Sequence, residues 1–97
     1  MRDTVQSIDR AFDILEVLAT EKAGLGVTEI AHRIGLHKST VYRLLASMAS
    51  RGYIEKNEST GTYRLGLKLV ELCSLYLNSL ELKTEAQPYL RKLAALT

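Results

Sequence analysis

Residues 27–51 read VTEIAHRIGLHKSTVYRLLASMASR, and this stretch decides the fold. Apolar residues repeat at three- and four-residue spacing on both sides of Gly35, as expected for one face of each of two short helices. These residues are Ile30, Ala31 and Ile34 before the glycine, and Leu36, Val41, Leu44, Leu45 and Met48 after it. Gly35 can take the left-handed conformation that a tight turn needs, and Ala31 is small enough for two helices to cross closely. The pattern predicts a helix-turn-helix.

A β-hairpin is predicted directly after the second of these helices. Gly52 is the residue type that commonly ends a helix. Two short alternating segments, 53–56 and 62–65, flank a turn region in which Gly61 supplies the turn. With a further helix in front, this order predicts a winged helix-turn-helix.

The helix in front is predicted from a stripe of apolar residues and a capping signal. Ser7 is the expected N-cap, and Asp9 lies in the first turn, where an anion favours the helix dipole. The stripe consists of Ile8, Ala11, Phe12, Leu15 and Leu18 or Ala19, widened by Ile14 and Val17. A glycine-containing loop follows, and either Gly26 or Thr28 caps the next helix.

Gly66 is followed by a predicted long helix over residues 67–82, in which ten of sixteen residues are apolar. So wide an apolar surface must be covered on two sides. Five exposed leucines would forgo roughly 7–15 kcal/mol, which rivals the total stability of a small domain, about 5–15 kcal/mol. We expect one side to pack on the first helix and the other on a second copy of this helix in a homodimer. The predicted dimerisation residues are Leu72, Leu75, Tyr76, Leu77 and Leu80.

Composition places the chain among mainly α intracellular proteins with a small β-hairpin. The 97 residues suffice for one small domain with an appended helix. A single cysteine excludes an internal disulfide and suits the reducing cytoplasm. No signal peptide and no apolar run of transmembrane length is recognisable, so we expect a cytoplasmic protein without a membrane partner.

The third helix, expected to begin near His37 or Lys38, carries the predicted DNA-binding residues. Residues 27–64 contain six cations and three anions, a local net charge of 6 − 3 = +3. The polar residues outside the apolar stripe of this helix are Lys38, Ser39, Thr40, Tyr42, Arg43 and Ser47. Small hydroxyls and free N–H groups at a helix N-terminus suit phosphate, and Arg43 can bind a guanine edge or a phosphate. The alternative is an ordinary solvated face.

Lys56 and Arg64 of the hairpin are predicted to contact the DNA backbone; the alternative is that they keep an edge strand soluble. A winged helix that binds another protein remains an alternative function, although it would carry an apolar third helix. An enzyme is not indicated. Cys73 lies in an apolar helix, and neither His32 nor His37 has metal-ligand spacing with the other or with Cys73. We expect no metal and no cofactor.

Five segments, in this order, resemble the N-terminal domain of the IclR family of bacterial transcription regulators. They are QSIDRA at 6–11, VTEIA at 27–31, LHKSTVYRLL at 36–45, GY at 52–53 and YRLG at 63–66. The resemblance implies a winged helix-turn-helix that binds operator DNA as a dimer held partly by the linker helix. It also implies a recognition surface made of Lys38, Ser39, Thr40, Tyr42 and Arg43. His37 stands where the family commonly has proline, which affects only the angle at which the third helix starts.

The resemblance also predicts the domain organisation. Residues 1–66 would be the winged helix-turn-helix domain and 67–83 the linker and dimerisation helix. Residues 84–97, an expected amphipathic helix, would begin a truncated C-terminal domain that binds a small-molecule effector. The chain would then be a fragment or a truncated gene product. The expected partners are a palindromic double-stranded DNA operator and a second copy of the chain, as a dimer or a dimer of dimers.

Overall fold

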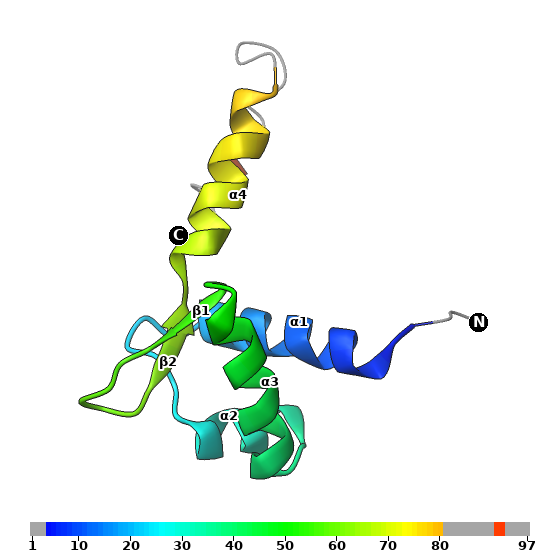
Figure 1. The fold of residues 1–97 in the computed structure, drawn as a ribbon, viewed down its shortest axis with the longest axis vertical. Coiled ribbons are helices and arrows are strands. Elements are labelled where there is room, and N and C mark those ends of the chain that lie inside the picture. The colour runs from blue at the N-terminus through cyan, green and yellow to red at the C-terminus, as the bar shows by residue number, and fades with distance from the viewer. Residues whose placement is uncertain (1–3, 81–90, 93–97) are drawn as a thin grey trace.

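The computed structural model describes residues 4–80 and 91–92. Its elements are, in order, α1 (Gln6–Ala19), α2 (Val27–Ile34), α3 (Lys38–Ser50), β1 (Ile54–Lys56), β2 (Tyr63–Leu65) and α4 (Leu67–Asn78). The first three helices pack together, the hairpin lies beside them, and α4 projects away from this body (Figure 1). This arrangement confirms the predicted mainly α fold with a small β-hairpin, a winged helix-turn-helix followed by a linker helix.

The turn between α2 and α3 has the predicted geometry. Gly35 adopts φ +72°, and its N–H donates to the carbonyl oxygen of Ala31 at 2.9 Å. The N–H of Leu36 donates to the same oxygen at 3.1 Å. Gly26 is the N-cap of α2, and His37 is the N-cap of α3, which therefore starts at Lys38.

The core lies where the three helices meet the hairpin. Its fully buried side chains come from α1, α2, α3 and β1, with Tyr63 of β2 only 4% exposed. These side chains are Ile14, Ile30, Val41, Leu45 and Ile54. Because the buried residues of α3 are Val41, Leu45 and Met48, the opposite face of this helix is exposed.

The N-cap expected for α1 is wrong, and its apolar stripe is confirmed only in part. The helix starts at Gln6 with Val5 as N-cap, because the carbonyl oxygen of Val5 accepts the N–H groups of Ile8 and Asp9 at 3.0 and 3.1 Å. Ser7 therefore lies inside the first turn. The predicted stripe faces the core only in part: Leu18 and Ile14 are buried and Leu15 packs against the core, whereas Ile8 and Phe12 are 53% and 57% exposed.

The hairpin is joined to the loop before α2 by an isolated β-bridge that the sequence did not indicate. Within the hairpin, Ile54 pairs with Leu65 and Lys56 with Tyr63, in antiparallel register. Tyr63 also exchanges two backbone hydrogen bonds with Leu25, at 2.9 and 2.7 Å. The wing is thereby anchored on both sides.

The α4 helix departs from two expectations. It ends at Asn78 instead of Leu82, because Ser79 caps it: the Ser79 N–H and hydroxyl both donate to the carbonyl oxygen of Tyr76, at 3.0 and 2.6 Å. The predicted packing of one side on the first helix is also wrong. No residue of α4 is buried, and an open groove separates the helix from α1.

The predicted tail helix at 84–97 lies outside the described residues except for Arg91 and Lys92, which are helical. In the described part of the chain, no helix has both the length and the apolar character needed to cross a membrane.

Candidate nucleic-acid interface

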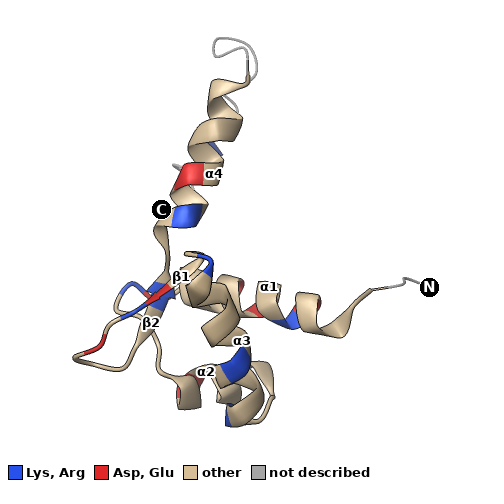
Figure 2. Cartoon of the chain, in the orientation of Figure 1, with Lys and Arg blue, Asp and Glu red and all other residues tan. Residues whose placement is uncertain are grey.

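The exposed face of α3 carries every residue predicted there. Lys38, Ser39, Thr40, Tyr42, Arg43 and Ser47 are all exposed. The helix contains no aspartate or glutamate, and Figure 2 shows blue but no red along it. The face therefore combines positive charge, hydroxyl groups and one phenol, a set that suits a polyanion. Contact of these residues with DNA stays a prediction.

The cations of α3 and Arg51, which follows it, are not held in ion pairs by the described part of the chain. Among the described residues, Lys38, Arg43 and Arg51 form no ion pair. Four other cations do, with nitrogen–oxygen distances from 2.6 to 3.6 Å: Arg10 with Asp13, Arg33 with Glu29 and Glu21, Arg64 with Glu55, and Lys68 with Glu71. Lys38, Arg43 and Arg51 are thus available to an incoming phosphate without first leaving a carboxylate.

The start of α3 adds a second feature that suits an anion. His37 makes no side-chain hydrogen bond that would cap the helix. The first N–H groups of a helix have no intrahelical acceptor, and they carry the positive end of the helix dipole. Ser39 and Thr40 leave room for a phosphate to approach them.

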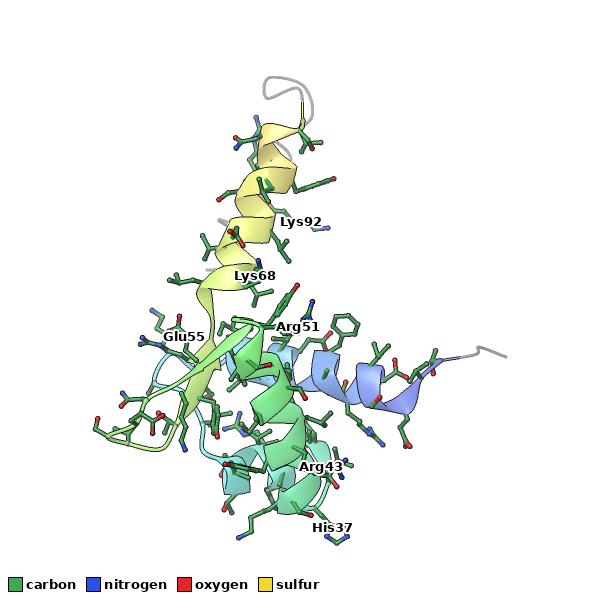
Figure 3. All side chains as sticks on the ribbon, in the orientation of Figure 1. His37, Arg43, Arg51, Glu55, Lys68 and Lys92 are labelled. Carbon is green, nitrogen blue, oxygen red and sulfur yellow. The ribbon has the colours of Figure 1, made fainter. Side chains whose placement is uncertain are left out.

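Arg51 is a candidate that the sequence analysis did not place. It is exposed and follows the last residue of α3, eight residues after Arg43 and therefore about two turns further along. Figure 3 shows Arg51 at the upper end of α3, close to the base of α4, where Lys68 lies. The hydrogen bond that the Lys68 ammonium donates to the Glu71 carboxylate raises the pKa of Lys68, and Lys68 is therefore a paired cation. Arg51 was counted in the local charge, but the sequence analysis did not include it among the polar residues of the exposed helix face.

The hairpin does not bring its two predicted DNA contacts together. Residues directly opposite each other share a face of the ribbon, so Lys56 lies on the face of Tyr63 and Arg64 on the opposite face, with Glu55. The Lys56 ammonium is 5.8 Å from the centre of the Tyr63 ring. The Arg64 guanidinium is 3.4 Å from a carboxylate oxygen of Glu55.

The turn of the wing is held by Asn57. Its side-chain oxygen accepts the N–H groups of Ser59 and Thr60, at 3.0 and 3.3 Å. Its main-chain oxygen accepts the N–H of Gly61, which has the positive φ of +75° expected from the sequence. The wing therefore presents Lys56 and Arg64 from a defined backbone.

The predicted dimerisation residues do not form one line. Leu72 and Tyr76 lie one turn apart on one side of α4, with Leu75 and Leu77 on either side of that line, and Leu80 lies beyond the end of the helix. Leu72, Leu75 and Tyr76 are exposed, whereas Leu77 and Leu80 are partly covered. In the part of the chain that the structure describes, no group of three or more His, Cys, Asp or Glu residues could hold a metal ion.

Comparisons with known proteins identify the family of the helix-turn-helix. A family model described as the IclR helix-turn-helix domain matches residues 7–58. The chain is 37% identical over 93 residues to the HTH-type transcriptional regulator XynR of Escherichia coli K12, covering 96% of this chain and 37% of XynR. It is 40% identical over 95 residues to the HTH-type transcriptional regulator KdgR of Dickeya chrysanthemi, covering 98% of this chain and 31% of KdgR.

Among solved structures, an IclR family transcriptional regulator from Brucella abortus is similar with a TM-score of 0.73 and 30% sequence identity. The similar part covers 91% of this chain and 34% of that one. The chain spans about a third of the length of the curated relatives it matches.

Proposed function

The chain belongs to the IclR family of DNA-binding transcription regulators, and from this premise we propose that it binds a palindromic operator as a homodimer. The observation that carries the proposal is the exposed face of α3, which has no acidic residue and whose Lys38 and Arg43 form no ion pair within the described part of the chain. A helix of this kind fits the major groove, and two-fold symmetry of the protein would be mirrored in the operator.

In the proposed complex, base reading and phosphate binding fall to different residues. Arg43 lies one turn inside α3 and would form two parallel hydrogen bonds to a guanine edge. Ser39, Thr40, Tyr42 and Ser47 would line the remaining contact surface of the helix. Lys38, the first N–H groups of α3, and the wing residues Lys56 and Arg64 would contact phosphates. Phosphate contacts fix the position of a protein on DNA, and base contacts supply its sequence preference.

The second copy would be held through α4, with Leu72, Leu75, Tyr76, Leu77 and Leu80 at the contact. Two copies of α3 would then lie in successive major grooves, about one helical turn or a multiple of it apart. A small-molecule effector would act through a further, C-terminal domain by changing this spacing. A DNA partner would place the protein in the cytoplasm.

Selection of bound duplexes from a random pool, at about physiological salt, tests the proposal, because affinity depends strongly on salt. The expected result is a palindromic consensus with two half-sites. Weak, salt-sensitive binding without a consensus would contradict sequence reading by this chain. A consensus with a single half-site would support sequence reading by this chain but contradict its binding as a dimer.

A further inference from the structure

The middle of the exposed face of α3 is a strip of small side chains around a single arginine. Ser39, Arg43, Ala46, Ser47 and Ser50 recur at three- and four-residue spacing on the side opposite the buried residues, and all five are exposed. Apart from Arg43, none of them is larger than serine. Small side chains let a helix approach the floor of the major groove closely, so that their own atoms reach the base edges. Ala46 was not among the residues predicted to contact DNA.

The residue types of α3 suit guanine and thymine but not the other two bases. In the major groove arginine and lysine pair with guanine, asparagine and glutamine pair with adenine, and aspartate and glutamate accept from cytosine. Residues 38–50 include Lys38 and Arg43 but contain none of these amide or acidic side chains. Thymine is recognised differently, because its C5 methyl group packs against the methyl groups of alanine or threonine. The helix offers Thr40 and Ala46 for such a contact.

Ala46 is better placed than Thr40 to contact a base. It follows Arg43 by three residues, which places it about 60° around the helix and about 4.5 Å further along it. Successive base pairs are about 3.4 Å apart, so the methyl group of Ala46 reaches a base about one or two pairs beyond the guanine. Thr40 lies in the first turn of α3, where the free N–H groups favour a phosphate.

Ser50, the next residue in line with Arg43 and Ala46, adds to the apolar character of this end of the strip. Its hydroxyl donates to the carbonyl oxygen of Ser47 at 2.7 Å, so its proton is not available to a base. The part of the strip that follows Arg43 therefore offers a methyl group where a hydrogen-bond donor could have stood. Such a surface fits the one apolar group of the major groove.

We propose that the methyl group of Ala46 packs against the C5 methyl group of a thymine in each half-site, close to the guanine that Arg43 reads. This inference rests on the proposed operator binding and adds the class of base that a second position accepts. Cytosine or adenine at that position would place an amino group against the methyl of Ala46, where it loses water and gains no acceptor. Ala46 therefore sets a preference for thymine without making a hydrogen bond.

Binding titrations of the 97-residue chain on the selected operator test the inference, with each thymine replaced in turn by deoxyuridine. Deoxyuridine pairs as thymine does and lacks only the methyl group. Replacing the contacted thymine in both half-sites is expected to weaken binding about 15-fold, since each lost methyl contact accounts for about fourfold. Replacing thymines elsewhere in the operator should leave the affinity nearly unchanged.

Ala46→Gly removes the methyl group from the protein instead of the DNA. It is expected to weaken binding to the thymine operator by the same factor and to add no loss on the deoxyuridine operator, because both changes remove one contact. Ala19→Gly is the matched control, since Ala19 is an exposed residue of α1 outside the proposed DNA contacts. Circular dichroism checks that each variant is folded. Ala46→Ser, with a better helix former than glycine, repeats the comparison and should lower the affinity more for thymine than for deoxyuridine.

Two results would overturn the inference and leave the proposed function standing. One is a palindromic consensus whose affinity does not change with deoxyuridine at any thymine. The other is a loss with deoxyuridine that persists in full in Ala46→Gly, which would assign the methyl contact to another residue such as Thr40. Selection that yields no consensus at all would overturn the proposed function together with this inference. The failure of the inference alone is therefore distinguishable from the failure of both.

Discussion

Gly66 passes against the main-chain carbonyl of Gly52 with no room for a side chain between them. A Cβ atom on Gly66 would also lie 2.9 Å from the nitrogen of Ile54 and 2.9 Å from the carbonyl carbon of Tyr53. Two backbone hydrogen bonds hold the segments together at this point. The N–H of Gly66 donates to the carbonyl oxygen of Tyr53 at 2.9 Å, and the N–H of Lys68 donates to the carbonyl oxygen of Gly52 at 3.1 Å. The chain that leaves α3 therefore fixes the direction in which α4 projects.

This crossing predicts that Gly66→Ala destabilises the fold. A methyl group that meets main-chain atoms forces the backbone to move, at a cost of about 1–3 kcal/mol in the free energy of unfolding. Gly26→Ala is the matched control, because Gly26 is also a helix N-cap with nearly the same backbone angles, φ −82° and ψ 170° against φ −100° and ψ 169°. The nearest atom to its added Cβ is 4.0 Å away, so we expect at most a small effect. Urea unfolding of both variants measures the difference, and equal midpoints would contradict the close crossing.

A second stability prediction concerns Leu45, whose side chain is fully buried in the core. Leu45→Ala leaves a cavity between α3 and its neighbours and is expected to cost about 2–5 kcal/mol. Leu67→Ala removes the same atoms from a side chain that is 71% exposed, and we expect a change within about 0.5 kcal/mol. Thermal unfolding in parallel compares the two. A loss at Leu67 as large as that at Leu45 would mean that Leu67 is covered in solution.

The helix-turn-helix and wing followed from local signals, since Gly35 and Gly61 take the positive φ values that their turns require. The inward face of α1 did not follow, because apolar residues occupy two of its sides. Periodicity alone could not separate Ile14, which is buried, from Phe12, which is exposed. The direction of α4 could not be predicted from the sequence either. It depends on the contact of Gly66 with Gly52, and local patterns do not report a contact between residues so far apart in the chain.

Among the proposed DNA contacts, Arg43 is expected to set base preference. Arg43→Ala should cost about 1–3 kcal/mol of binding to the selected operator and relax the preference at one position of each half-site. Arg33→Ala removes the same charge from α2, where Arg33 is hydrogen-bonded to Glu29 at 2.9 Å, and should leave the consensus unchanged. Binding titrations against single-base variants of the operator distinguish the two. An equal loss on every sequence would make Arg43 a phosphate contact instead.

A substitution in the wing is expected to raise DNA affinity instead of lowering it. The carboxylate of Glu55 lies 3.4 Å from the Arg64 guanidinium and also repels phosphate. Glu55→Gln frees the guanidinium and is expected to raise affinity for any duplex about threefold to tenfold. It should also steepen the dependence of log K on log salt by about 0.9, the increment for one more phosphate contact.

Glu58→Gln is the control, since Glu58 is exposed in the turn of the same wing and forms no ion pair among the described residues. It makes the same change in net charge without releasing a cation. Titrations at several salt concentrations separate the two variants. If both raise affinity equally and leave the salt slope unchanged, Arg64 does not contact the backbone, and Lys56, on the opposite face of the ribbon, remains the contact from the wing.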